Sequence, residues 1–283
     1  MNKIDMTVII LTKNEEKNLS DCLESLKDSF ERVIIVDSYS EDETYSISQK
    51  YNCEFVQHAF VNYGEQFQWA LEHLEIKTKW VFRLDADERL TEKSLDEIKF
   101  LANKHYEDNV NGIVFPLEVK FMGKRLRYGG TYPFKKLCIF KKDFAYMEKR
   151  EMDEQIIITE GEIVEMKNVS LHEDFKSLTY WIDKHNWYAT RAAKDFLNRA
   201  KKGDEYADLD RSAKIRRYVK YNIYYKLPSI IRTSSYFFYR YFIRLGFLDG
   251  YIGFLYNFLQ AYWYRVLVDA KIYELQKTKE KYN

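Results

Sequence analysis

The chain has 283 residues, 46% of them hydrophobic and 31% charged, which is enough for one large α/β domain with or without a helical appendage and argues against disorder. Its 45 basic and 44 acidic residues leave a net charge of +1, so the overall charge indicates no nucleic-acid partner. Three widely spaced cysteines fit a reducing compartment and provide no metal site, and no apolar run reaches the roughly 18 to 20 residues of a membrane-spanning helix.

Short apolar runs alternate with helical patterns over the first hundred residues. The predicted strands are 7–11, 33–36, 53–56 and 80–84, and the predicted helices are 19–30, 43–51, 64–74 and one that begins near Ser94. Ser94 and Glu97 have the spacing of a capping box at the start of that last helix. This βαβαβαβα order predicts a doubly wound, mostly parallel sheet.

The pattern changes in the second half of the chain. Strand-like stretches at 112–119 and 137–140 predict a mixed extension of the sheet, and 178–200 reads as a helix that ends at a break near Gly203. We therefore predict two domains, a catalytic α/β domain over residues 1–202 and a helical, basic and aromatic region over residues 203–283.

Polar side chains follow three of the predicted strands. Asn14 and Glu15 follow the first strand, Asp37 the second, and Asp85 and Asp87 the strand at 80–84. Ligands of a doubly wound sheet bind beyond the carboxyl ends of its strands, so a site is expected there. Asp85 and Asp87 could hold a divalent cation together with substrate phosphates. The alternative is that Asp87 caps a helix and Asp85 is a turn residue.

The other polar groups also leave two interpretations open. Asp37 could accept a hydrogen bond from a nucleobase or ribose, or it could be a turn residue. Asn14 and Glu15 could bind the same ligand or cap the following helix. The acidic run 151–154 could supply a general base, and His172 a metal ligand, or both could be polar loops. No dinucleotide-binding, P-loop or nucleophile-elbow motif is present.

The order of these motifs resembles inverting glycosyltransferase family 2, which has the GT-A fold. The residues that carry the resemblance are Thr12-Lys13-Asn14-Glu15-Glu16, Val36-Asp37-Ser38 and Asp85-Ala86-Asp87-Glu88. The stretches 151–156 and 181–189 resemble a bacterial subgroup that acts on lipopolysaccharide, capsule or related surface glycans. The resemblance covers roughly residues 6 to 200.

The resemblance implies a role for each matching residue. The residues that would bind the nucleotide-sugar are Thr12, Asn14, Glu15, Asp37 and Asp85. The residues that would hold the metal ion (Mg²⁺ or Mn²⁺) are Asp85, Asp87 and His172. The catalytic base would be Asp153 or Glu154, with Glu154 favoured. Relatives often have an arginine where this chain has Cys138, so Lys135 or Lys136 is the expected substitute for its phosphate contact.

The implied reaction is a single displacement that moves a sugar from a nucleotide-sugar, by family habit a UDP-sugar, to a hydroxyl of a lipid-linked or surface-glycan acceptor. Two rivals stay open. A sugar-phosphate nucleotidyltransferase would need a glycine-rich basic loop after the first strand, and a non-catalytic membrane adaptor would not need the acidic residues. The apolar part of the N-terminus is too short for a signal peptide, so a cytoplasmic location on the inner face of the membrane is expected.

The C-terminal region is basic and aromatic. Nine Lys and Arg residues and no acidic residue lie between Arg211 and Arg244, interleaved with Tyr and Phe. This pattern predicts docking on an anionic membrane surface, with 245–263 lying in or near the interface as a membrane-associated extension. A nucleic-acid partner is the less favoured interpretation, and packing on the catalytic domain is the remaining alternative.

Overall fold

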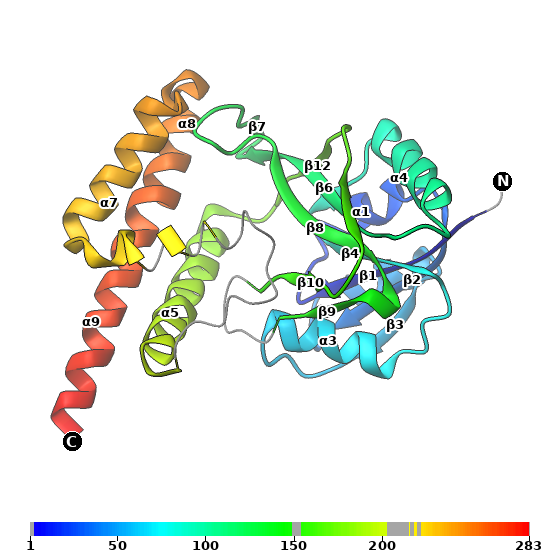
Figure 1. The fold of residues 1–283 in the computed structure, drawn as a ribbon, viewed down its shortest axis with the longest axis horizontal. Coiled ribbons are helices and arrows are strands. Elements are labelled where there is room, and N and C mark those ends of the chain that lie inside the picture. Colours follow the sequence, from blue (N-terminus) through cyan, green and yellow to red (C-terminus); the bar gives the residue numbers. More distant parts are fainter. Residues whose placement is uncertain (1–2, 149–153, 203–214, 216–217, 220–221, 283) are drawn as a thin grey trace. The chain divides into compact units, whose positions relative to one another are not determined.

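The computed structural model describes residues 3–148, 154–202, 215, 218–219 and 222–282 (Figure 1). The described residues form two units, the first built from 3–125, 132–148 and 154–176 and the second from 126–131 and 177–282. The chain therefore changes unit between Lys176 and Ser177, whereas the boundary predicted after residue 202 lies at the end of a helix of the second unit.

The first unit contains a ten-stranded sheet in the order β3-β2-β1-β4-β8-β6-β12-β5, with β7 and β11 paired to β6 (Figure 1). Its strands are β1 (Ile4–Thr12), β2 (Phe30–Asp37), β3 (Glu54–Gln57), β4 (Trp80–Asp85), β5 (Glu88–Arg89), β6 (Val110–Phe121), β7 (Lys124–Arg125), β8 (Phe134–Lys141), β11 (Glu162–Glu165) and β12 (Ser170–His172). Neighbouring strands from β3 to β4 are parallel, β8 is antiparallel to both β4 and β6, and β12 is parallel to β6. The predicted mostly parallel α/β sheet is confirmed.

The remaining elements of this unit complete the layers around the sheet. They are the helices α1 (Leu19–Ser25), α2 (Thr44–Lys50), α3 (Tyr63–His73) and α4 (Glu92–Lys104), the short helix η1 (Lys142–Phe144), and the strand pair β9 (Ala145–Met147) and β10 (Ile156–Ile158). Successive side chains of β1 point to opposite faces. Val8 and Ile10 pack in the core with α1 and α4, and Ile9 packs with α3. Apolar side chains on both faces explain why β1 reads as a continuous apolar run.

Two local predictions are wrong. The helix predicted over 19–30 ends at Ser25, because Lys27 and Asp28 have left-handed backbone angles (φ 50° and 51°), and Phe30 starts β2. The capping box of α4 is formed by Thr91 and Ser94 rather than by Ser94 and Glu97. Glu97 lies inside the helix, where its carboxylate accepts hydrogen bonds from the backbone N–H groups of residues 167 and 168.

The second unit is helical, as predicted. It contains α5 (Leu178–Lys202), η2 (Tyr224–Lys226), α7 (Ser229–Phe238), the π-helix η3 (Tyr239–Ile243), η4 (Gly246–Asp249), α8 (Gly250–Asn257), the π-helix η5 (Phe258–Trp263) and α9 (Tyr264–Tyr282). Its core joins Ala189 and Ala193 of α5 to Tyr264, Val268 and Ile272 of α9. Across the residues that the structure describes, none of the helices combines the length and hydropathy of a membrane span.

The basic residues of this region divide into three groups. Arg232 is ion-paired with Asp269, and buried Arg240 donates hydrogen bonds to the Gly129 carbonyl and the Thr131 hydroxyl. Lys226 and Arg244 are exposed. The other five basic residues of the predicted membrane patch, Arg211, Lys214, Arg216, Arg217 and Lys220, lie outside the described residues. Arg232 and Arg240, both expected to face lipid, therefore bind partners within the second unit.

Candidate active site

The carboxyl ends of three parallel strands bring the predicted residues together. In the sheet register Thr12 of β1 pairs with Asp37 of β2, and Leu11 of β1 pairs with Asp85 of β4. Because parallel strands end at the same edge, the loops after β1, β2 and β4 meet there, where ligands of such sheets bind.

Asp37 is fully buried and organises the loops after β1 and β2. Its Oδ1 accepts hydrogen bonds from Thr12 Oγ1 at 2.8 Å and Ser40 Oγ at 2.5 Å, and its Oδ2 accepts from Ser40 N at 2.8 Å and Gln57 Nε2 at 3.2 Å. An ionised carboxylate offers about four lone-pair sites, so these four bonds fill it. A nucleobase that binds Asp37 would have to replace one of them.

Asn14 shapes the loop after β1. Its φ of 55° lies in the left-handed region, which asparagine tolerates better than most residues. Its backbone N–H donates to Ser40 Oγ at 2.7 Å, and its side-chain Oδ1 accepts from Glu41 N at 2.9 Å. The loops after β1 and β2 are therefore joined by hydrogen bonds before any ligand is bound.

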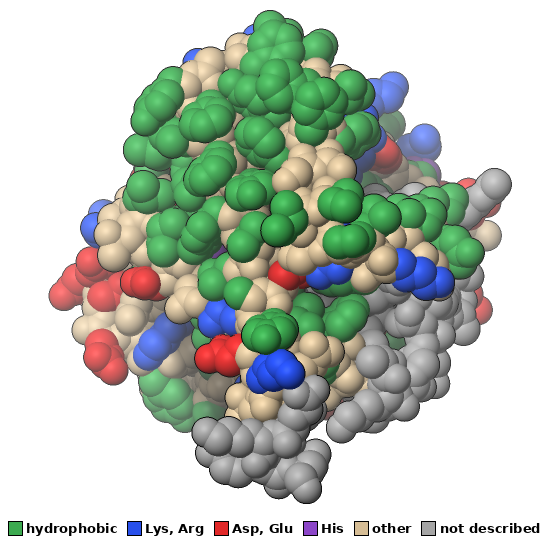
Figure 2. Space-filling model, turned by 90° about the vertical axis from the view of Figure 1, so that its left-hand side faces the viewer, with side chains coloured by type: hydrophobic (Ala, Val, Ile, Leu, Met, Phe, Trp, Pro, Cys, Tyr) green, Lys and Arg blue, Asp and Glu red, His purple; other side chains and the backbone are tan. Residues whose placement is uncertain are grey.

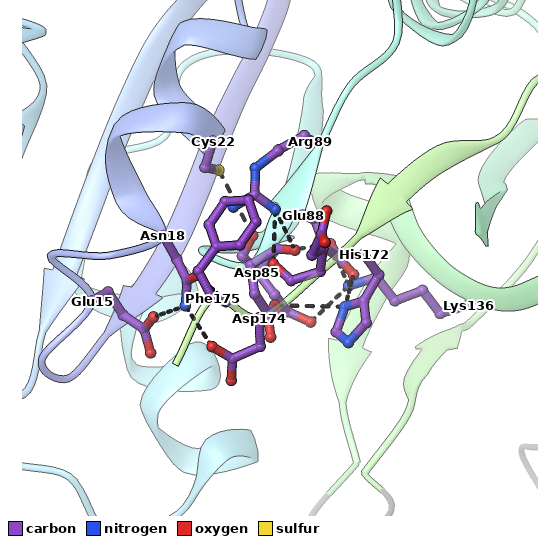
Figure 3. A network of polar contacts seen from close by, with 12 residues as sticks. Glu15, Asn18, Cys22, Asp85, Glu88, Arg89, Lys136, His172, Asp174 and Phe175 are labelled. Carbon is purple, nitrogen blue, oxygen red and sulfur yellow. Dashed lines mark hydrogen bonds and ion pairs between the residues drawn. The ribbon is translucent and has the colours of Figure 1, made fainter. Parts of the chain in front are cut away.

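A second polar cluster ties the loop after β1 to the segment after β12 (Figure 3). Asn18 donates from Nδ2 to Glu15 Oε2 and to Asp174 Oδ1, both at 2.9 Å, and accepts from Phe175 N at 2.9 Å. Glu15 Oε1 accepts from Lys176 Nζ at 2.6 Å. Burial raises the pKa of Glu15, although Lys176 and Asn18 oppose the rise. Sequence reasoning missed Asn18 and Lys176, because the bonds of Asn18 to Asp174 and Phe175 and of Lys176 to Glu15 each span more than 150 residues.

Asp85 and Glu88 are held by a lysine. The Lys136 Nζ lies 2.8 Å from Asp85 Oδ2 and 2.6 Å from Glu88 Oε1, and Tyr63 donates its hydroxyl to the other oxygen of Asp85. Burial opposes ionisation of Asp85, but Lys136 and Arg83 outweigh it and hold the pKa well below its usual range. Burial, with Asp85 nearby, raises the pKa of Glu88 despite Lys136.

Asp87 and His172 lie close together where β5 pairs with β12. The antiparallel pairing of β12 with β5 sets His172 opposite Glu88 (Figure 3). His172 Nδ1 lies 3.6 Å from Asp87 Oδ1 and 3.9 Å from Glu88 Oε1. Both separations are too long for hydrogen bonds, and the 3.6 Å gap is within the span of two metal–ligand bonds of about 2.1 Å each.

These two side chains suit a divalent ion that takes its remaining ligands from substrate. Within the described part of the chain, no group of three or more His, Cys, Asp or Glu side chains is arranged to hold a metal ion. Asp85, a predicted ligand, has its oxygens bound to Tyr63 and Lys136. Mg²⁺ commonly uses one or two carboxylates and completes its shell with substrate phosphates and water, so Asp87 could supply the carboxylate, and His172 could add a nitrogen ligand beside it.

Glu154, the favoured base, lies beside the start of α3. A Cβ added at Gly64 would be 3.1 Å from Glu154 Cγ, so the glycine leaves room for this carboxylate. Gly64 follows Tyr63, whose hydroxyl binds Asp85, so Glu154 contacts the helix that also reaches Asp85. Asp153, the alternative base, lies outside the described residues.

The two lysines expected to replace a phosphate-binding arginine are both paired with acids. Lys136 binds Asp85 and Glu88, whereas the Lys135 Nζ lies 2.5 Å from Glu165 Oε1. Adjacent side chains of a strand point to opposite faces, so only Lys136 reaches the site. Cys138 is fully buried, and burial raises the pKa of its thiol.

Comparison with known proteins gives the family of this chain. The family model described as Glycosyl transferase family 2 matches residues 7–156. An uncharacterized glycosyltransferase of Rickettsia conorii is 27% identical over 207 residues, covering 70% of this chain and 72% of that protein. LpsC of Rhizobium meliloti, a lipopolysaccharide core biosynthesis glycosyltransferase, is 38% identical over 101 residues, covering 34% of this chain and 36% of its own length.

The solved structures similar to this chain include residues 1–349 of S. aureus TarS. That structure is 15% identical to this chain, with a TM-score of 0.45, and the match covers 100% of this chain and 92% of that one. The matched family segment runs from β1 to the start of β10 and so contains the loops that carry Asp37, Asp85, Asp87 and Glu154. The chain belongs to glycosyl transferase family 2 and is a glycosyltransferase.

Proposed function

We propose that this glycosyltransferase moves a sugar from a nucleotide-sugar, specifically a UDP-sugar, to a hydroxyl group of a lipid-linked or surface-glycan acceptor, with inversion at the anomeric carbon. The observation that carries the proposal is the convergence of Asp87 and His172 at 3.6 Å beside the loops after β1, β2 and β4. Within family 2, this is where a diphosphate and its ion would be expected.

The loops after β1 and β2 are the proposed nucleotide site. Thr12, Asn14 and Asp37 are linked through Ser40 by hydrogen bonds, so the two loops are already held in place, and a base that binds Asp37 would replace one of the bonds to that carboxylate. Glu15, in the loop after β1, is held by hydrogen bonds from Asn18 and from Lys176, which follows β12. Pre-organised groups lower the conformational cost of binding, which supports a ligand at this position.

Asp87 and His172 are the proposed ligands of a Mg²⁺ or Mn²⁺ ion. The ion, when bound, supplies positive charge that stabilises the departing nucleoside diphosphate. Asp87 supplies a hard carboxylate oxygen, and the neutral imidazole of His172 supplies a nitrogen donor. His172 is oriented for this by its place in β12, opposite Glu88.

Glu154 is the proposed general base. It would take the proton of the acceptor hydroxyl while that oxygen forms a bond to the anomeric carbon and the bond to the diphosphate breaks. A single displacement of this kind inverts the anomeric centre. The half-buried position of Glu154 beside Gly64 and Tyr63 supports the assignment.

We further propose that the second unit attaches the enzyme to the inner face of the membrane. Figure 2 shows hydrophobic side chains gathered over a face of the molecule, and the exposed large ones on α7, η3, η4 and α8 include Ile230, Ile231, Phe238, Phe242, Ile243, Leu248 and Tyr251. Asp249 is the only acidic residue between 227 and 263, all of which are described, and it is buried. Exposed apolar patches of this kind mark membrane or protein contacts.

A surface glycan is the proposed class of acceptor. LpsC, which matches a third of this chain, is named for lipopolysaccharide core biosynthesis, and attachment to the membrane would bring the enzyme to a lipid-linked substrate. A nucleotidyltransferase is less well supported, because the loop after β1 lacks the glycine-rich basic sequence and the family model is that of glycosyltransferases.

The proposal is tested by donor turnover. Purified protein is incubated with Mn²⁺ and a panel of UDP-, GDP-, CDP- and dTDP-sugars, and released nucleoside diphosphate is measured with and without membrane lipid extract. We expect release from a UDP-sugar that increases with the extract. Turnover of only another nucleotide-sugar would refute the UDP assignment, and release of inorganic pyrophosphate from a sugar phosphate and UTP would favour the nucleotidyltransferase.

A further inference from the structure

The predicted metal motif already contains a cation supplied by the protein. Lys136 on β8 is almost buried, with 10% of its side chain exposed, and its Nζ lies between Asp85 Oδ2 at 2.8 Å and Glu88 Oε1 at 2.6 Å (Figure 3). The Glu88 side chain is only 1% exposed. A buried lysine with two carboxylate partners forms a strong pair that is costly to break.

Each oxygen of the two carboxylates has a partner. Tyr63 donates to the second oxygen of Asp85, and the backbone N–H of Asp85 donates to Glu88 Oε2 at 3.1 Å. A divalent ion that bound Asp85 or Glu88 would compete with the ammonium group for these carboxylates. Asp87 lies in the same turn of the chain but faces His172 instead.

We propose that Lys136 is a positioning residue that occupies Asp85 and Glu88 as an internal cation and thereby directs the divalent ion to Asp87 and His172. Three carboxylates lie close together here, and one fixed positive charge reduces their attraction for a second cation. The identity of the ion rests on the proposed function, whereas the pairing of Lys136 rests on the contacts described above.

The pairing makes an unusual prediction, since removal of a positive charge should improve metal binding while it lowers stability. Without Lys136, Asp85 and Glu88 lose their counter-charge, and both carboxylates become available beside Asp87. We expect Lys136→Met to bind Mn²⁺ at least about tenfold more tightly than the wild type, because each unpaired carboxylate attracts the ion over a few ångströms.

The test is a calorimetric titration of the full chain with Mn²⁺ alone, without nucleotide. Lys135→Met is the matched control, because Lys135 is the preceding residue of β8 and its partner is Glu165. The control is expected to bind Mn²⁺ as the wild type does. Unchanged affinity in Lys136→Met, or an equal gain in Lys135→Met, would overturn the proposal.

A second pair of variants keeps the test decisive if Lys136→Met does not fold. With Lys136 in place, Asp85→Asn should change Mn²⁺ affinity by less than about threefold, whereas Asp87→Asn should weaken it at least about tenfold. An equal loss in the two variants would make Asp85 a metal ligand and refute the role of Lys136. These titrations use no sugar donor, so failure to detect sugar transfer would count against the proposed function and not against this inference.

Discussion

Asn18 gives the sharpest prediction about how the site is held together. This residue is fully buried, and its amide joins Glu15 and Asp174 through Nδ2 and the backbone of Phe175 through Oδ1. Replacement of Asn18 by Ala removes all three hydrogen bonds, and replacement by Asp keeps the shape but turns a donor into an acceptor that faces two carboxylates.

The magnitude follows from the kinds of partner. Hydrogen bonds to charged groups contribute about 1.5 to 3 kcal/mol each and a bond between neutral groups about 1 kcal/mol, and such values are not additive. We therefore expect Asn18→Ala to lower the free energy of unfolding by about 3 kcal/mol. Asn18→Asp should lower it at least as much at neutral pH, because a third carboxylate then lies beside Glu15 and Asp174.

The assay is urea unfolding at neutral pH, monitored by circular dichroism. Asn103→Ala is the control, because Asn103 is exposed near the end of α4. A surface substitution of this type usually changes the free energy of unfolding by no more than about 0.5 kcal/mol. If the free energy of unfolding falls by less than about 1 kcal/mol in both Asn18 variants, the hydrogen bonds of Asn18 do not hold the loop after β1.

Three further predictions concern the reaction, pH and membrane attachment. Glu154→Gln should reduce sugar transfer at least about a hundredfold yet leave the calorimetric affinity for UDP with Mn²⁺ within about twofold, and normal transfer would place the base elsewhere. Burial lowers the pKa of His185, which stacks on Trp181, to about 4, so its contribution to stability is present above pH 6.5 and is lost as the pH falls toward 4. Between these pH values the wild type should lose about 2 kcal/mol more unfolding free energy than His185→Phe in urea titrations, and parallel losses would refute this. Ile243→Asp and Tyr251→Asp should each weaken co-sedimentation with anionic and with neutral vesicles, whereas binding that depends only on vesicle charge would contradict attachment through the apolar face.

The order of strands and helices could be predicted because it depends on local patterns. The continuous apolar run of β1 and the polar residues after β1, β2 and β4 are visible in the sequence, and parallel pairing then brings Thr12, Asp37 and Asp85 to one edge. Element ends were less predictable. Nothing in the helical spacing around Phe30 reveals that residues 27 and 28 adopt left-handed angles and end α1 early.

The side-chain contacts that the sequence does not predict join residues that are distant in the chain. Lys136 was considered as a phosphate ligand, but its pairing with Asp85 and Glu88 depends on β8 lying next to β4 in the antiparallel direction. Arg232 and Arg240 count as surface charges in a sequence, although one pairs with Asp269 and the other with the 129–131 turn.

The central claim is that Asp87 and His172 support sugar transfer from a UDP-sugar. It is tested most directly by Mn²⁺-dependent release of nucleoside diphosphate from UDP-sugars by the wild type, Asp87→Asn and His172→Ala, with folding checked by circular dichroism. We expect release by the wild type and a loss of at least about a hundredfold in both folded variants. Wild-type rates in either variant, or no release from any UDP-sugar by the wild type, would contradict the claim.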